Sequence, residues 1–97
     1  MYAITFDLDQ DALKNAYPGP SHTAYVEIRK ILIDEGFAWT QGSVYFGGKK
    51  INAVTCVLAA QRLVRALPWF ATAIRDIRML GIEDNNDLGP AIEDATE

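Results

Sequence analysis

The order of hydrophobic patterns along the chain is the feature that most constrains its fold. Alternating or β-rich runs mark strands, and apolar residues that recur every three or four positions mark helices. The strands are expected at residues 1–9, 37–41, 43–46 and 73–83, and the main helices at residues 21–34 and 51–67. The order strand, helix, two strands, helix, strand is that of an α+β, ferredoxin-like βαββαβ sandwich. We therefore expect one antiparallel-type sheet with the helices on one face and the other face open.

Turn residues set the boundaries of these elements. Residues 9–15 form a predicted helical turn that ends at Tyr17-Pro-Gly-Pro20, because two prolines cannot continue a helix. Ser21 is expected to cap the next helix, and Gly36 to end it. A helix that begins near residue 51 should end before Pro68.

The first strand carries acidic residues on its polar side. Its alternation sends Tyr2, Ile4, Phe6 and Leu8 to one face, and Thr5, Asp7 and Asp9 to the other. Because aspartate is rare in strands and loses solvation there, Asp7 is the first residue to suspect of chemistry. The alternative is that Asp7 is a solvated residue at the strand end. Asp9 either takes part in the chemistry or caps the following helical turn.

The length and composition predict one small domain. A chain of 97 residues, of which 49% are hydrophobic, can bury a single core. We expect a ferredoxin-like domain at residues 1–83 and an acidic C-terminal extension at residues 84–97. The single cysteine, Cys56, excludes an internal disulfide and lies in an apolar run typical of a buried thiol. Since no secretion signal or membrane-length apolar run is present, we expect a soluble, cytoplasmic protein.

Charge is distributed unevenly along the chain. The net charge is −4, but residues 83–97 hold six acidic residues and no basic ones, which leaves seven acidic and nine basic residues in 1–82. The body of the protein is therefore weakly basic and could bind nucleic acid. The basic residues form local pairs that are either modest basic patches or ordinary solvated faces: Arg29 and Lys30, Lys49 and Lys50, Arg62 and Arg65, and Arg75 and Arg78.

The expected topology brings acidic residues of two strands together. We expect the first and third strands to be parallel neighbours, and the fourth to lie antiparallel beside the first. Asp76, near the start of the fourth strand, can then approach Asp7. The residues expected on the open face are Thr5, Asp7, Asp9, Ser43, Tyr45, Asp76 and Arg78. This small face, bordered by Ala3 and Leu80, would also suit a symmetric dimer.

Four segments carry motifs that cover nearly the whole chain. They are MYAITFDLD, YPGPSHTAYVEIRKIL, GFAWTQGSVYFG and PWFATAIRDIRMLGIEDNND. With these segments the sequence resembles the virulence-associated protein D (VapD) family. The resemblance implies a ferredoxin-like homodimer, related to CRISPR-associated endonuclease subunits, that acts as an endoribonuclease toxin with a cognate antitoxin protein. It also implies that Asp7 is the main catalytic residue, with Ser43 and Asp76 beside it.

We therefore expect cleavage of single-stranded RNA, with mRNA as the substrate. Asp7 could act as a base toward the ribose 2′-hydroxyl, or with Asp9 it could hold a divalent ion such as magnesium that activates water. The residues expected to contact RNA are Tyr45, by stacking, and Lys49, Lys50, Arg75 and Arg78, at phosphates. One alternative is a non-catalytic, homodimeric RNA- or protein-binding module that uses the open sheet face. Another is a structural dimer in which Arg78 neutralises the two aspartates.

Overall fold

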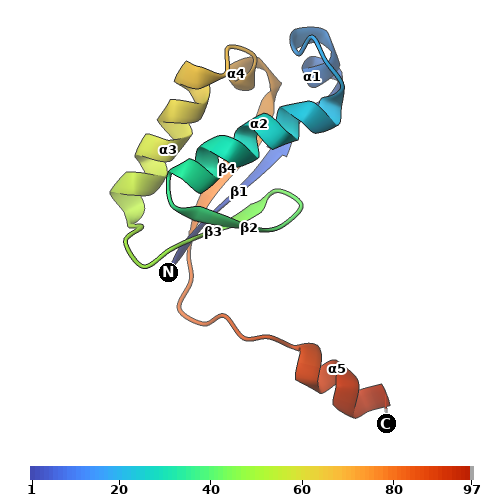
Figure 1. The fold of residues 1–97 in the computed structure, drawn as a ribbon, viewed down its shortest axis with the longest axis vertical. Coiled ribbons are helices and arrows are strands. Elements are labelled where there is room, and N and C mark those ends of the chain that lie inside the picture. Colours follow the sequence, from blue (N-terminus) through green and yellow to red (C-terminus); the bar gives the residue numbers. More distant parts are fainter. Residues whose placement is uncertain (97) are drawn as a thin grey trace.

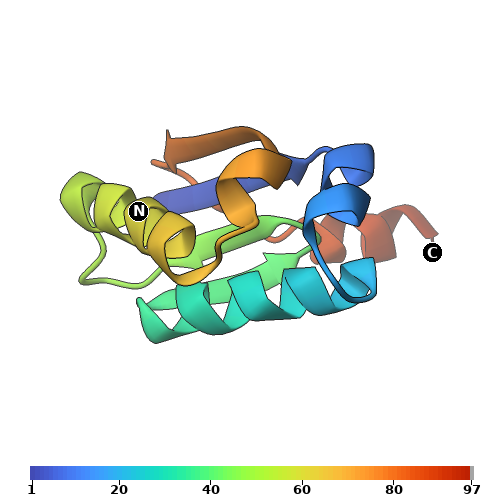
Figure 2. The same cartoon turned by 90° about the horizontal axis from the view of Figure 1, so that it is seen from above.

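A four-stranded sheet covered by helices on one face forms the body of the protein. The structure is a computed structural model that describes residues 1–96. Its strands are β1 (Tyr2–Leu8), β2 (Phe37–Gln41), β3 (Val44–Gly47) and β4 (Ile74–Gly81). Its helices are α1 (Gln10–Ala16), α2 (Ser21–Asp34), α3 (Ala53–Ala66), α4 (Phe70–Ala73) and α5 (Gly89–Thr96). Helices α2 and α3 lie over the same side of the sheet (Figures 1 and 2), so the predicted ferredoxin-like α+β fold is confirmed.

The sheet has the strand order β2-β3-β1-β4, and all neighbouring strands are antiparallel. The prediction that the first and third strands run parallel is wrong. The crossover through α2 makes β2 parallel to β1, and β3 returns between them after a hairpin, so β3 must oppose both. The predicted antiparallel pairing of β4 with β1 is confirmed, with Asp76 directly opposite Asp7.

The core lies between the sheet and the two long helices. Alternate residues of β1 face this side, as predicted, and Ile4 and Leu8 are each only 2% exposed. They pack in one cluster with residues that recur at helical spacing in α2 and α3. The buried helix residues are Ala24, Ile28 and Leu32 in α2, and Cys56, Ala59 and Leu63 in α3.

The ends of the helices differ in detail from the predicted ones. Ser21 is the first residue of α2 and not its cap, because Pro20 occupies the N-cap position with an extended backbone. Gly36 follows the C-cap with a φ of 102°, the left-handed conformation that glycine tolerates. Helix α3 begins at Ala53 because Asn52 at the N-cap and Thr55 in the first turn form a capping box.

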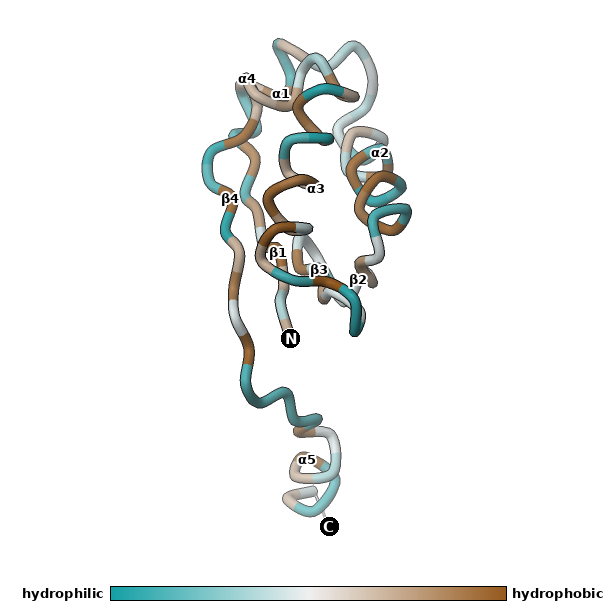
Figure 3. The backbone as a smooth tube through the Cα atoms, turned by 90° about the vertical axis from the view of Figure 1, so that its left-hand side faces the viewer, coloured by the Kyte–Doolittle hydropathy of each residue, from teal (hydrophilic) through white to brown (hydrophobic). Residues whose placement is uncertain are grey.

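Beyond β4 the chain leaves the body. The segment between β4 and α5 is largely hydrophilic (Figure 3), and α5 stands clear of the sheet and the other helices (Figure 1). Its apolar residues are unburied, with Ile92 65% exposed, and Leu88 just before the helix is 71% exposed. Of the predicted acidic extension, Glu97 lies outside the described residues. No helix within residues 1–96 combines the length and apolar character that a membrane span needs.

Candidate active site

The C-terminal end of β1 places an aspartate on the open face of the sheet. The side chain of Asp7 is 61% exposed, whereas its neighbours Phe6 and Leu8 are buried against the helices. Asp76 of β4 lies directly opposite, so the predicted approach of these two residues is confirmed. Two carboxylates that face each other across an antiparallel pair repel, and this end of the sheet therefore needs positive charge.

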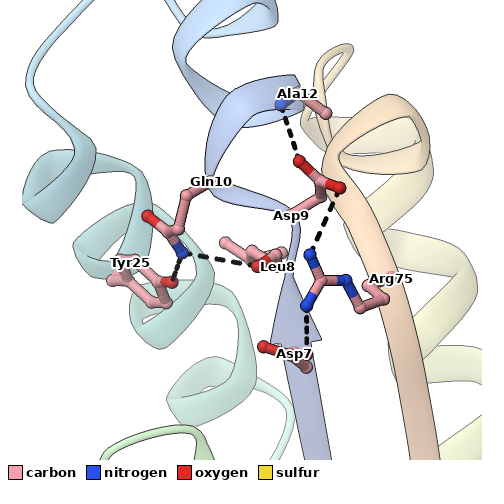
Figure 4. Close-up of polar contacts among 7 residues, drawn as sticks. All are labelled: Asp7, Leu8, Asp9, Gln10, Ala12, Tyr25 and Arg75. Carbon is pink, nitrogen blue, oxygen red and sulfur yellow. Dashed lines mark hydrogen bonds and ion pairs between the residues drawn. The ribbon is translucent and has the colours of Figure 1, made fainter.

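Two arginines of β4 supply that charge. The guanidinium of Arg75 lies between two carboxylates, 3.5 Å from Asp7 Oδ2 and 3.3 Å from Asp9 Oδ2 (Figure 4). Arg78 Nε donates a hydrogen bond of 3.0 Å to Asp76 Oδ2, which raises the pKa of the Arg78 guanidinium. All of these side chains are well exposed, so the ion pairs add little stability and can exchange for contacts with a charged ligand.

A β-bulge explains how Arg75 reaches the carboxylates. Strict alternation along β4 predicts that Arg75 and Asp76 point to opposite faces. The pairing instead shifts, so that Asp7 opposes Asp76 while Leu8 opposes Ile74, and Arg75 is the extra residue. Such a bulge changes the direction of a side chain. It leaves both Arg75 and Asp76 exposed and brings the guanidinium to Asp7.

Asp9 caps the first helix. Its Oδ1 accepts a hydrogen bond of 2.9 Å from the backbone N–H of Ala12, so the capping interpretation is confirmed. This hydrogen bond, and secondly the one from Arg75, lowers the pKa of the Asp9 carboxyl below its usual value. Both carboxylate oxygens of Asp9 are thus engaged.

Asp7 and Asp9, the two predicted metal ligands, therefore differ in how well they could bind a metal ion. Within residues 1–96 there is no group of three or more His, Cys, Asp or Glu side chains that could hold a metal ion. Magnesium is nevertheless commonly held by one or two carboxylates together with waters and substrate phosphates. Asp7, whose Oδ1 is not used by Arg75, fits that role, whereas Asp9 would have to give up its cap or its ion pair.

Tyr45 is not on the open face, so the prediction that it faces Asp7 and stacks on RNA there is wrong. Its side chain is 1% exposed and lies opposite Ile4, on the helix side of the sheet. Its ring stacks on Phe6, with 6.1 Å between the centroids, and burial raises the pKa of its hydroxyl. The alternation of β3 instead directs Phe46, which is half-buried and opposite Ala3, to the open face.

Ser43 lies at the same end of the sheet as Asp7 but not on the same face. Its carbonyl accepts a hydrogen bond of 3.2 Å from the N–H of Phe6, so the register sets Ser43 opposite Phe6. The residue lines a cavity beside α2. The expectation that Ser43 shares the open face with Asp7 is therefore wrong, and its catalytic role stays a prediction.

Lys49 and Lys50 lie far from Asp7 along the sheet. They follow β3, which runs antiparallel to β1, and so they are near the beginning of β1 while Asp7 is near its end. Both side chains are exposed. Their contact with RNA stays a prediction, and the structure does not bring them to the acidic residues.

The sequence interpretation missed a cavity of about 550 Å³ between α2 and the β2–β3 hairpin. Its polar and aromatic lining comes from His22, Tyr25, Arg29, Trp39 and Ser43. A signal was present, since the three residues from α2 recur at helical spacing and so share one side of that helix.

Comparison with known proteins agrees with this fold. The family model described as CRISPR associated protein Cas2 matches residues 1–88, which include the whole sheet and the acidic residues at the end of β1. The open-faced ferredoxin-like sheet and this match define the class of protein: it is a Cas2-family protein.

Similar proteins with curated names identify the group more narrowly. The chain is 54% identical over 93 residues to Endoribonuclease VapD 2 of Riemerella anatipestifer, an alignment that covers 95% of this chain and 99% of that protein. It is 53% identical to the Endoribonuclease VapD homolog of Helicobacter pylori, over 96% of this chain and 97% of that protein. Endoribonuclease VapD of Dichelobacter nodosus is 41% identical over 98% of this chain and its own full length. The chain belongs to the VapD family.

Proposed function

We propose that the protein is an endoribonuclease that cleaves single-stranded RNA such as mRNA, with Asp7 as the main catalytic residue. One observation carries the proposal: Asp7 is an exposed carboxylate at the end of a central strand, next to Arg75 and opposite Asp76. The relatives, which are named endoribonucleases and align over nearly the whole chain, support the same activity.

In one route, Asp7 acts as a general base. It takes the proton from a ribose 2′-hydroxyl, whose oxygen then attacks the adjacent phosphorus and displaces the 5′-oxygen of the next nucleotide, which takes up a proton from water. The products are a 2′,3′-cyclic phosphate and a 5′-hydroxyl. Arg75 and Arg78 are close and exposed, and they would neutralise the charge on the phosphate while Asp76 orients Arg78.

In the other route, Asp7 would hold a divalent ion such as magnesium together with the substrate phosphate, and the ion would supply activated water. The products then include a 5′-phosphate. In this route Arg75 has to move from Asp7 to the phosphate when RNA binds, which its exposed ion pair permits. The two routes differ in the ends of the products, so the choice between them is open to measurement.

We also propose that the protein is a homodimer and the toxin of a toxin–antitoxin pair in the cytoplasm, with a cognate antitoxin protein as its partner. The toxin role and its partner rest on the VapD resemblance. The apolar part of the open face, where Ala3 lies between Phe46 and Leu80 in the strand register, supports the dimer, because Leu80 is 42% exposed.

The test is RNA cleavage by the wild type and by Asp7→Asn, with Asp94→Asn of the exposed α5 as the matched control. Each protein is incubated with labelled single-stranded RNA, with and without EDTA, and the product ends are analysed. Loss of a catalytic base typically slows such a step by about 10²–10⁴-fold, so we expect a loss of this size in Asp7→Asn and none in Asp94→Asn.

The same measurement separates the alternatives. Cyclic ends that form in the presence of EDTA support the direct base, and EDTA-sensitive cleavage with 5′-phosphate ends supports the metal route. Equal cleavage by the wild type and Asp7→Asn would remove Asp7 from the mechanism. If the wild type binds several RNAs but cleaves none, the protein is an RNA-binding module and not a nuclease.

A further inference from the structure

The cavity between α2 and the β2–β3 hairpin combines flat rings with a few polar groups. Its volume of about 550 Å³ is within the range of small-molecule sites, which is about 300–1,000 Å³. The rings of Tyr25 and Trp39 line it, together with Arg29, His22 and Ser43. Trp39 remains 46% exposed although its neighbours on the helix side of the sheet are buried. A large aromatic surface is therefore accessible from solvent at this cavity.

The two central residues of the cavity are held in place. The guanidinium carbon of Arg29 lies 3.5 Å from the centroid of the Trp39 ring, a cation–π contact. Trp39 Nε1 donates a hydrogen bond of 2.9 Å to the carbonyl of Gly42, which fixes the indole against the hairpin. Arg29 Nε is buried and makes no hydrogen bond within the described residues. The cavity thus offers an ordered aromatic surface for stacking.

We propose that this cavity binds one unpaired nucleobase of an RNA strand, an inference that rests on the proposed RNA substrate. Stacking of unpaired bases on aromatic rings and on guanidinium planes is the usual way in which proteins bind single-stranded RNA. The edges of nucleobases carry donor and acceptor atoms that suit the hydroxyl of Ser43, which lines the cavity.

The lining favours a base over a phosphate group. Arg29 is the one permanently charged side chain among the lining residues, and it is already stacked on Trp39. A phosphate site normally gathers several cations or backbone N–H groups. The rings of Tyr25 and Trp39 would gain little from a phosphate, whereas a base can cover them.

Hydrogen bonds connect the walls of the cavity to the segment that carries Asp7. Gln10 Nε2 donates to the hydroxyl of Tyr25 at 2.9 Å and to the carbonyl of Leu8 at 3.3 Å (Figure 4). On the other side, the carbonyl of Ser43 accepts from the N–H of Phe6. Both contacts reach residues directly next to Asp7. The cavity and Asp7 are therefore at the same end of the sheet but on opposite faces, and an RNA strand with one base in the cavity would have to pass around this end to reach Asp7.

The test is binding of a 2′-O-methyl oligonucleotide in EDTA, a probe that neither proposed route cleaves. The fluorescence of Trp39 reports the binding. Trp69 is 7% exposed, and the Trp39→Phe variant measures its contribution to the fluorescence signal alone. Stacking of one base is worth about a tenfold change in affinity. We expect Trp39→Ala to bind about tenfold more weakly by anisotropy of a labelled oligonucleotide, and Trp39→Phe to retain part of the affinity. Ile33→Ala, an exposed apolar position elsewhere on α2, should bind like the wild type.

An oligonucleotide of the same length with abasic sites distinguishes base recognition from phosphate contact. It should bind wild type and Trp39→Ala equally weakly. Equal affinity for the intact and the abasic strand, or an unchanged affinity in a folded Trp39→Ala, would overturn the base site and leave the cavity for another ligand, such as a protein segment.

The result of this binding test is independent of the result of the RNA cleavage test. Cleavage by the wild type without base-dependent binding at Trp39 would overturn the base site alone. Base-dependent binding without cleavage would overturn the nuclease and support the base site.

Discussion

Arg75 is the residue that sets the electrostatics of the open face. It is the extra residue of a bulge, and its guanidinium is shared by Asp7 and Asp9. Neither contact is short, and the side chains are 42–61% exposed, so solvent screens both ion pairs. An arginine held loosely between two carboxylates can turn to a phosphate without a large loss of stability, which is useful at a site for a polyanion.

The pKa of Asp9 gives a pH-dependent prediction. The folded state lowers this pKa below the usual value of 3.8, first through the hydrogen bond from Ala12 and then through Arg75. A lowered carboxyl pKa stabilises the fold above the unfolded pKa, and the contribution is lost as the pH falls through the folded pKa. Asp9→Ala should therefore lower the melting temperature by a few degrees at about pH 6, and the difference from wild type should shrink by about pH 3. Thermal unfolding followed by circular dichroism measures the two melting temperatures. A difference between them that grows toward low pH would contradict the prediction.

Cys56 gives a second prediction at this scale. The thiol is 2% exposed in the core, and burial raises its pKa. Since the thiolate is the reactive form, the native protein should react slowly with a thiol reagent at neutral pH and rapidly in denaturant. Stopped-flow labelling measures both rates. Fast native labelling, at a rate like that of the unfolded chain, would mean that α3 opens readily from the sheet.

At the scale of elements, the N-terminus of α3 depends on one local motif. Asn52 Oδ1 accepts from the N–H of Thr55 at 3.0 Å, and Thr55 Oγ1 accepts from the N–H of Asn52 at 2.8 Å. Loss of such a cap costs about 1 kcal/mol. Asn52→Ala should lower the melting temperature by about 4–8 °C. Asn15→Ala, at an exposed position of α1, is the control and should change it little; equal values for the two variants would show that the capping box does not stabilise α3.

The elements that depend on local pattern could be predicted from the sequence, and those that depend on pairing could not. The alternation of β1 and the helical spacing in α2 and α3 are local, and the structure confirms them. The face of Tyr45 depends on where β3 begins and on its register with β1, which no single strand encodes. The position of Arg75 depends on a bulge between two strands distant in the chain.

The acidic part of the site was more accessible to prediction than the cavity. Asp7 stands out because aspartate is uncommon in a strand, and its approach to Asp76 follows from the strand order. The cavity needs Trp39 of β2 to meet Arg29 of α2, and each of these residues alone has the pattern of an ordinary half-exposed position. Only the packing of the hairpin beside the helix brings them together.

At the scale of the whole molecule, the two faces of the sheet differ in the residues they carry and in their proposed roles. The helix side contains the core and, at its margin, the cavity. The open side is polar where Asp7 and Asp76 meet, and apolar toward the other end, where Ala3 lies between Phe46 and Leu80 in the strand register. Ala3 is fully buried even so, which shows how closely its neighbours cover it. The proposed dimer would use this apolar part and leave the acidic end open to RNA.

The proposed dimer leads to a prediction about a single substitution. Leu80 is 42% exposed on the apolar part of the open face, and a stable interface buries about 800 Å² on each partner, so a dimer through this small face has to include it. Leu80→Glu would place an unpaired charge in the interface and is expected to give single chains, whereas the wild type has twice the mass of one chain.

Val54→Glu, at a 64% exposed position of α3 on the covered side of the sheet, is the matched control and should remain dimeric. Light scattering during size-exclusion chromatography measures the three masses. A dimeric Leu80→Glu would exclude the apolar part of the open face from the interface. A monomeric Val54→Glu with a dimeric Leu80→Glu would move the interface to α3, on the side of the sheet away from Asp7. In that arrangement the second copy would leave the whole open face free for RNA.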